Sequence, residues 1–169
     1  ATGRRRILVF NHCYHGTVDE TLVVRGADGR TLPRPGQVGR VHDFGAETLV
    51  VEFNDSLALE AALASGDVAC VLAEPVMTNV GMVLPLPGFL EGLRDACTRT
   101  GTLLAIDETH TLSSGRGGYA RVHGLAADFL VVGKSVAGGL PCAVLGYTEA
   151  VAERLRAAEG TRETGHSGI

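Results

Sequence analysis

Three charged residues that could do chemistry each follow an apolar run of the sequence: Glu74, Asp107 and Lys134. A lysine amine that is partly removed from water loses affinity for its proton, and the neutral amine forms a Schiff base with aldehydes. A carboxylate can hold a pyridine nitrogen in its protonated form. Taken singly, each has a commoner explanation, because lysines often reach solvent from loops and acidic residues often cap helices or loops.

The elements that must position these residues follow an alternating pattern. Strands are predicted at residues 7–10, 68–73, 103–106, 129–132 and 143–145, and helices at 57–63, 87–100 and 149–158. Residues 22–53, with a turn at Asp28-Gly29, favour antiparallel or irregular structure. Continuous apolar strands that alternate with helices indicate a mostly parallel sheet covered on both faces, a three-layer α/β/α fold.

Ligands of such sheets bind beyond the carboxyl ends of the strands. Glu74, Asp107 and Lys134 should therefore meet at one edge of the sheet. Tyr14-His15-Gly16 follows the first predicted strand and could place an aromatic face at the same edge.

Composition excludes several other classes of protein. The 169 residues are 45% hydrophobic and 20% charged, with a formal net charge of -4, which favours one globular domain and no nucleic-acid surface. No apolar run approaches the length of a membrane span, and the start of the sequence lacks a signal-peptide pattern. The four cysteines form no CxxC pair, so we expect reduced thiols in a cytoplasmic protein, without a metal site or disulfides.

Several segments together resemble one family, the class III (subgroup II, fold type I) pyridoxal-phosphate-dependent aminotransferases. Each is weak alone, but their order along the chain is specific. The segments are Tyr14-His15-Gly16, Glu74-Pro75-Val76, Pro87-Gly88-Phe89-Leu90 with Leu93-Arg94, Leu103 through Glu108, and Gly133-Lys134-Ser135 through Gly138-Gly139-Leu140-Pro141. Residues 74–82 and 113–119 most resemble members near glutamate-1-semialdehyde aminomutase and the β-amino-acid transaminases.

The resemblance implies the fold of a PLP-dependent transferase-like large domain and a role for each site residue. Lys134 would hold pyridoxal 5'-phosphate as a Schiff base and move protons between substrate and cofactor. Asp107 would pair with the pyridine nitrogen, and Tyr14 would stack on the ring. Glu74 would belong to the network near ring and substrate, and His15 would lie beside the cofactor as a neighbouring ring, not as a base.

One departure from the family concerns His110. Many relatives have Asp-Glu-Val-Gln where this chain has Asp107-Glu108-Thr109-His110. The fourth residue of that run would lie near the cofactor's phenolic oxygen, where His110 could donate a hydrogen bond and bring a group that titrates near neutral pH. The alternative is a histidine that faces away from the cofactor.

The resemblance also implies that residues 1–169 are an internal part of the PLP-binding large domain. The N-terminal segment, the rest of the large domain and the C-terminal small domain would lie outside it, together with the phosphate-binding residues. The partner subunit would supply one phosphate contact, so the family expectation is a homodimer with shared active sites. We therefore expect these residues alone to bind the cofactor poorly and not to turn over.

Three functions stay open at this point. One is an aminotransferase that moves an amino group between an amino acid or amine and a keto-acid acceptor. Another is an aminomutase, an isomerase that moves the amino group within one molecule. The third is an inactive fragment that acts only as a binding module. A dinucleotide-binding dehydrogenase is disfavoured, because no GxGxxG follows the first predicted strand.

Overall fold

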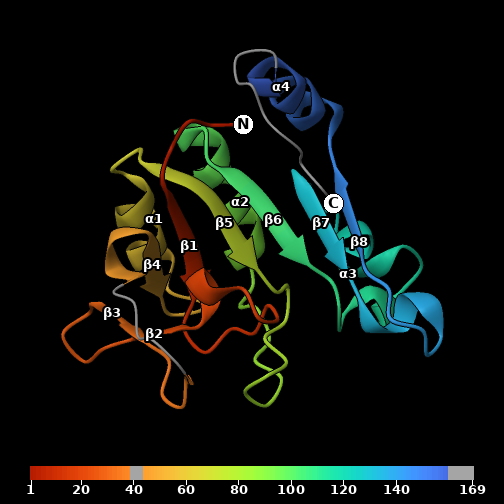
Figure 1. The fold of residues 1–169 in the computed structure, drawn as a ribbon, viewed down its shortest axis with the longest axis horizontal. Helices are drawn as coiled ribbons and strands as arrows, with labels where there is room; N and C mark the ends of the chain where they lie inside the picture. Colours follow the sequence, from red (N-terminus) through yellow and green to blue (C-terminus); the bar gives the residue numbers. More distant parts are fainter. Residues whose placement is uncertain (39–43, 160–169) are drawn as a thin grey trace.

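The computed structural model describes residues 1–38 and 44–159 and is built around a six-stranded sheet (Figure 1). The order across the sheet is β4-β1-β5-β6-β7-β8, in which the first five strands are parallel and β8 runs antiparallel to β7. The strands are β1 (Arg6–Phe10), β4 (Thr48–Val51), β5 (Val68–Ala73), β6 (Leu103–Asp107), β7 (Phe129–Val132) and β8 (Val144–Tyr147). The mostly parallel α/β fold predicted from the sequence is confirmed.

The segment that looked antiparallel or irregular contains two different structures. Strands β2 (Val23–Arg25) and β3 (Thr31–Pro33) form an antiparallel hairpin, as the turn at Asp28-Gly29 predicts. Strand β4, by contrast, joins the main sheet in parallel with β1, so that part of the prediction was wrong. A local turn sets only the hairpin beside it, whereas the partner of a later strand depends on which apolar surface it buries.

Two helices pack against each other on one face of the sheet, behind the strands in Figure 1. Helix α1 (Ser56–Leu63) begins at Asp55, whose carboxylate accepts the backbone N–H of Ala58 at 2.9 Å. Helix α2 (Phe89–Thr100) ends at Gly101, which has a φ of 65°. Both helix boundaries follow the predicted caps. In the ranges described, these two helices form a single layer on the sheet.

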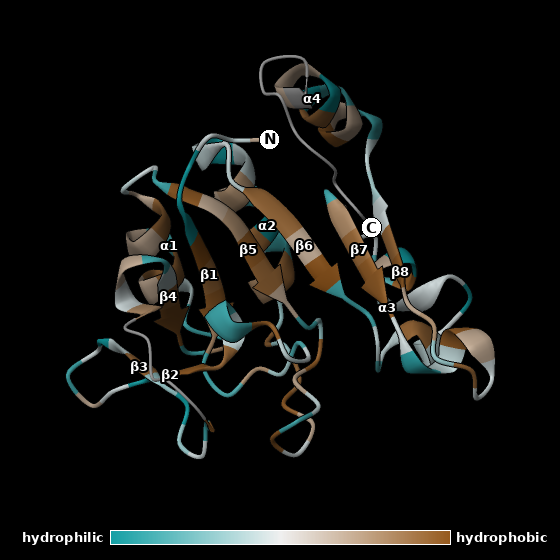
Figure 2. Ribbon diagram, in the orientation of Figure 1, coloured by the Kyte–Doolittle hydropathy of each residue, from teal (hydrophilic) through white to brown (hydrophobic). Residues whose placement is uncertain are grey.

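The hydrophobic core lies between this helix layer and the strands. Both layers contribute core members that are at most 1% exposed, among them Leu8, Val71, Leu104, Leu59, Leu63, Leu93 and Cys97. Figure 2 shows the central strands as the most hydrophobic part of the ribbon, with polar residues concentrated in the connecting loops. No helix within residues 1–38 and 44–159 has the length and apolar character that a membrane crossing would need.

A buried carboxylate fixes the chain that leaves β6. The fully buried Glu108 accepts the backbone N–H groups of Tyr119 and Ala120, both at 2.7 Å, and the Thr111 hydroxyl at 3.1 Å. Helix α3 (Gly118–Val122), which the sequence did not predict, begins at this carboxylate. A Cβ on Gly118 would lie 2.5 Å from Glu108 Oε2, so only glycine fits there. These hydrogen bonds thereby hold in place the loop between β6 and α3, which begins at the candidate site.

Helix α4 (Glu149–Glu159) follows β8 and lies beyond the opposite end of the sheet from the strand carboxyl ends (Figure 1). The described part of the chain also contains four 3-10 turns: η1 (Asp19–Thr21), η2 (Phe44–Ala46), η3 (Leu112–Ser114) and η4 (Lys134–Ala137). The last of these begins at the lysine singled out in the sequence. The residues that could take part in chemistry therefore lie at the opposite end of the sheet from α4.

Candidate functional site

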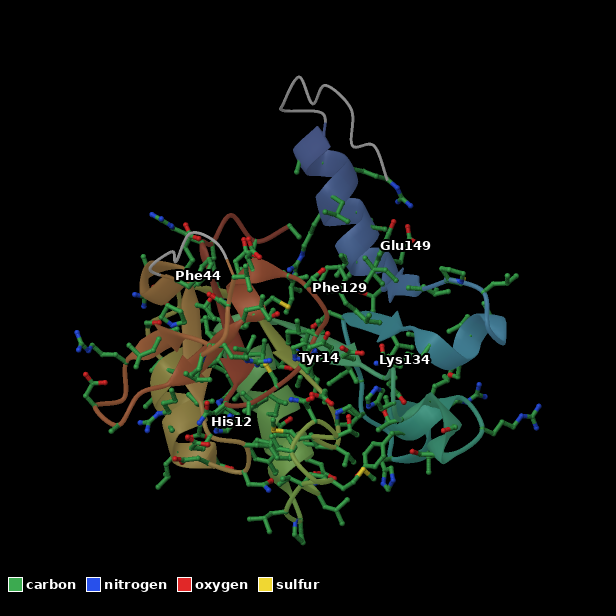
Figure 3. All side chains as sticks on the ribbon, turned by 60° about the horizontal axis from the view of Figure 1, so that its bottom comes forward. His12, Tyr14, Phe44, Phe129, Lys134 and Glu149 are labelled. Atoms are coloured by element: carbon green, nitrogen blue, oxygen red, sulfur yellow. The ribbon has the colours of Figure 1, made fainter. Side chains whose placement is uncertain are left out.

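A cavity of about 180 Å³ lies beyond the carboxyl ends of β1, β5, β6 and β7. It is lined by all six residues that the sequence singles out: Tyr14, His15, Glu74, Asp107, His110 and Lys134. Figure 3 looks toward this end of the sheet and shows Tyr14 and Lys134 facing the same region. The predicted meeting of the charged strand-end residues at one edge is confirmed, because β5, β6 and β7 are parallel neighbours.

His15 and Asp107 form a buried ion pair at this cavity. Nδ1 of His15 lies 2.8 Å from Oδ2 of Asp107, and the side chains are only 3% and 9% exposed. The second oxygen of Asp107 accepts the backbone N–H of Thr109 at 3.0 Å. Nε2 of His15 is buried and has no hydrogen-bond partner among residues 1–38 and 44–159. Through the contact of its Nδ1 with Oδ2, His15 holds the Asp107 carboxylate in its orientation.

Both members of this pair are charged near neutral pH. Burial disfavours a charged His15 ring, but the interactions with Asp107 and with Cys13 outweigh burial and raise its pKa to about 9. Burial likewise opposes ionisation of Asp107, yet the hydrogen bonds from His15 and Thr109 lower the pKa of this carboxyl below its ordinary value. Asp107 thus lines the cavity as an anion.

The raised pKa of His15 predicts a pH-dependent stability. A group whose folded pKa lies above its ordinary value of 6.5 stabilises the fold fully below that value, and the contribution is lost as pH rises through about 9. The shift corresponds to about 3 kcal/mol. Urea unfolding of the full-length protein at a series of pH values should show the free energy of unfolding falling between pH 6.5 and 9.

The variant His15→Asn should remove this fall, because asparagine can face Asp107 but has no proton to release. The exposed His123, which does not contact Asp107, provides the matched control, and His123→Asn should keep the fall. An unchanged pH dependence in His15→Asn would show that another group causes it.

A second network joins Glu74 to His110. Glu74 is 6% exposed, and its Oε1 accepts the backbone N–H of Tyr14 at 3.2 Å. Its Oε2 accepts both the backbone N–H of Thr78 at 3.2 Å and the Thr78 hydroxyl at 2.9 Å. The same hydroxyl oxygen is hydrogen-bonded to Nδ1 of His110. His110 therefore faces the cavity, which decides between the two orientations left open by the sequence.

Lys134 differs from its prediction in one respect. The sequence favoured a lysine partly removed from water, whereas the structure leaves its side chain exposed at the cavity. The reason is local: β7 ends at Val132, and Lys134 opens η4 with a φ of 49°, a left-handed conformation uncommon for residues other than glycine. Among the described residues, nothing is placed to cover the amine.

The glycines around Lys134 have two different surroundings. A Cβ on Gly133 would lie 3.3 Å from Thr109 Oγ1, so this glycine lets the chain pass close to the end of β6. A Cβ on Gly138 or Gly139 would meet nothing within 4 Å. The described residues therefore leave open space beside these two glycines.

Three further polar residues of the cavity were not predicted as site residues: Thr78, Asn79 and Thr109. Thr109 holds Asp107 through its backbone N–H, and Thr78 links Glu74 to His110. A threonine on a loop carries no distinctive signal by itself. The position of Thr78, four residues after Glu74 in a turn-rich segment, was the only available hint.

The chain is similar in sequence to known proteins. A sequence model of the family described as aminotransferase class III matches residues 1–167. The chain is 40% identical over 148 residues to a glutamate-1-semialdehyde 2,1-aminomutase of Opitutus terrae, covering 86% of this chain and 35% of that protein. It is 37% identical over 167 residues to a protein of the same name from Geotalea daltonii, covering 97% of this chain and 39% of that protein.

Solved structures agree with this match. A glutamate-1-semialdehyde aminomutase from Pseudomonas aeruginosa PAO1 is 50% identical with a TM-score of 0.90, covering 99% of this chain and 37% of that one. A variant of that protein was solved in complex with PMP. An omega-transaminase from Sphaerobacter thermophilus is 30% identical with a TM-score of 0.84, covering 99% and 40%.

These relatives are longer proteins, since the chain spans 35% to 39% of the length of the two curated ones. Within that span the match extends over nearly every residue and includes the edge of the sheet that carries the cavity. The chain belongs to the class III aminotransferase family.

Proposed function

We propose that the protein containing this chain is a pyridoxal-phosphate-dependent enzyme that moves an amino group between an amino acid or amine and a keto acid. The observation that carries the proposal is the presence of an exposed lysine amine and a buried, ionised carboxylate in one cavity, on Lys134 and Asp107. An amine captures an aldehyde, and an anion stabilises a protonated pyridine nitrogen.

The side chains of the cavity fit this cofactor. Asp107 is held as an anion by His15 and Thr109, which suits a cationic ring nitrogen. The Tyr14 side chain is 44% exposed at the cavity and offers a ring face for stacking. The Lys134 amine is open to an incoming aldehyde. When bound, the cofactor supplies an electron sink for bonds at the substrate's α-carbon.

Each residue would then have a distinct task. Lys134 would bind the aldehyde and, once released by the substrate amine, carry a proton to and from the substrate carbon. Asp107 would hold the ring nitrogen, and Tyr14 would orient the ring. Glu74 would fix the loop that bears Tyr14 through its bond to that backbone N–H.

The extent of the chain shapes the rest of the proposal. We place residues 1–169 inside a larger cofactor-binding domain, with the phosphate contacts and a small domain supplied elsewhere in the protein. The length of the matched relatives supports this placement. A cytoplasmic homodimer with shared active sites is part of the same proposal, as is a keto-acid acceptor.

A second candidate function is the aminomutase, in which the amino group moves within one molecule. It is favoured by the relatives named glutamate-1-semialdehyde 2,1-aminomutase and by the 50% identity to a structure of that name, against 30% to the omega-transaminase. Both functions use the same lysine and the same ring contacts, so the cavity described here serves either one.

Product analysis on the full-length protein with pyridoxal phosphate separates the two. A transaminase needs a keto acid to complete its cycle, whereas an aminomutase converts glutamate-1-semialdehyde without one. Turnover that requires an added keto acid supports the first function, and turnover without it supports the second. If the full-length protein shows no absorbance band of lysine-bound cofactor, both functions are wrong.

A further inference from the structure

We infer that His110 is a base for the substrate amine, held in one protonation pattern by a relay that runs from Glu74 through Thr78. The inference rests on the proposed function, because it concerns the amine that would react at Lys134. The relay presents Nε2 of the neutral His110 ring as a proton acceptor for the ammonium form in which an amine substrate arrives. A glutamine side chain at this position could not play this part, because an amide does not accept a proton near neutral pH.

The direction of each hydrogen bond fixes the proton on the ring. Oε2 of Glu74 already accepts the Thr78 backbone N–H, which can only donate. The Thr78 hydroxyl donates its single proton to the same carboxylate oxygen at 2.9 Å. That hydroxyl therefore has only lone pairs left for His110, so Nδ1 of His110 must carry the proton of their shared hydrogen bond.

A neutral imidazole has one N–H and one acceptor nitrogen. With the proton held on Nδ1, the acceptor is Nε2, and the exposed His110 side chain leaves that nitrogen accessible. The arrangement follows the rule that the partner of one ring nitrogen sets the state of the other. In other enzymes a base oriented by a third group in this way is a mark of proton-transfer sites.

The position of His110 places this acceptor between two cavities. One is the 180 Å³ cavity that it shares with Lys134. The other, of about 570 Å³, is lined on its apolar side by Val76, Met82 and Leu84. Thr78 and His110 belong to both. An amine whose apolar part occupies the wider cavity would have its nitrogen beside His110 and the lysine.

The proposed step is a simple proton transfer. The substrate R–NH₃⁺ gives one proton to Nε2, the N–H electron pair returns to nitrogen as the lone pair, and His110 becomes an imidazolium. The free amine is then a nucleophile. The imidazolium keeps its bond to Thr78 through Nδ1 and releases the added proton to water, because its side chain is exposed.

The charged neighbours have opposing effects on this imidazolium. Glu74, linked through Thr78, and Asp107 across the cavity favour it, while Lys134 and the charged His15 oppose it. On the side of the wider cavity, the titratable groups are Tyr119 and His123. Of these charged groups, Glu74 is the one that hydrogen bonds connect to His110, through the Thr78 hydroxyl.

The family resemblance suggested another role, in which His110 donates a hydrogen bond to an oxygen of the cofactor. The neutral ring cannot do this through Nε2, because its only proton is engaged with Thr78. Donation would require the doubly protonated ring. The protonation state of His110 therefore separates the two roles by experiment.

Nitrogen NMR of ring-labelled histidines in the full-length protein reads this state without any turnover. We expect neutral His110 to carry its proton on Nδ1 in the wild-type protein, with His110→Asn used to assign the signal. Thr78→Val should abolish this preference, because valine cannot accept the bond. A ring that is protonated on Nε2 alone, or doubly protonated at neutral pH, would overturn the inference.

Rapid kinetics supply the second readout. The rate at which a subsaturating amine consumes the band of lysine-bound cofactor should fall by about 10- to 100-fold in His110→Asn and Thr78→Val. The defect of His110→Asn should shrink about tenfold for each pH unit, because the free amine rises tenfold per unit below its pKa. His12→Asn, at an exposed histidine that lines neither cavity, is the matched control.

The outcomes keep the two proposals apart. A normal cofactor band in both variants with a slower amine reaction supports the relay. A normal band with wild-type rates at every pH shows that His110 is not the base, while the proposed function stands. A missing band in the wild-type protein defeats the proposed function itself.

Discussion

Replacing Lys134 with alanine should abolish covalent binding of pyridoxal phosphate and reduce turnover of the full-length protein by more than about 10⁴-fold. The physical reason is that two tasks, capture of the aldehyde and proton transfer at the substrate carbon, would be lost together. Lys134 is the only lysine in these 169 residues, since every other basic residue counted with it is an arginine. No neighbouring amine of this segment can take its place.

Because the segment has a single lysine, the attachment site of the cofactor can be identified by chemical modification. Borohydride reduction of the cofactor-loaded protein, followed by peptide mapping, should find the modified residue at Lys134. Before reduction, the absorbance band of lysine-bound cofactor should be absent from Lys134→Ala. Lys134→Arg is the matched control, because it keeps the positive charge but has no amine that condenses with an aldehyde. A persistent band in either variant would place the attachment site outside these residues.

Replacing Asp107 with asparagine should lower the turnover rate by about 100-fold or more, because the anion expected to hold the ring nitrogen protonated is removed. Asp107 is 9% exposed on its side chain and is paired with His15 at 2.8 Å, whereas the other carboxylate of the cavity, that of Glu74, already accepts hydrogen bonds from Tyr14 and Thr78. The same change should lower the pKa of His15 from about 9 toward 6.5, because its carboxylate partner is lost.

Two readouts test the Asp107 prediction independently. Steady-state kinetics give the rate, and a histidine NMR titration gives the pKa of His15 without any cofactor. Asp107→Glu retains the charge and should recover part of the activity, while Asp19→Asn changes an exposed acid that lines no part of the cavity. Wild-type rates in Asp107→Asn would remove this carboxylate from the proposed chemistry.

Local patterns were sufficient for the framework of the fold. Helix α1 begins where Asp55 predicts and helix α2 ends where Gly101 predicts, because capping depends on residues next to each other in the chain. The start of α2 lies at Phe89, two residues after the predicted one. The apolar runs became β5, β6 and β7. Parallel pairing of these runs then brings their carboxyl ends to one edge, which is a consequence of topology and needs no detailed coordinates.

Contacts between residues far apart in the chain could not be predicted from the sequence. Whether Thr48–Val51 pairs with its hairpin neighbour or with β1 is decided by tertiary packing. Helix α3 exists because Glu108 accepts its first N–H groups, and no propensity in a short glycine-rich stretch announces such a partner. The exposure of Lys134 likewise reflects the turn that follows β7.

The sequence by itself determined the family, the mostly parallel sheet and the edge at which Glu74, Asp107 and Lys134 meet, because these depend on residue type, order and periodicity. Only the tertiary structure decided which groups hold one another. The bond of His15 to Asp107 spans 92 residues, and that of His110 to Thr78 spans 32. A hydrogen bond requires its two heavy atoms to lie about 3 Å apart. For residues far apart in the chain, that separation is decided by how the strands pack.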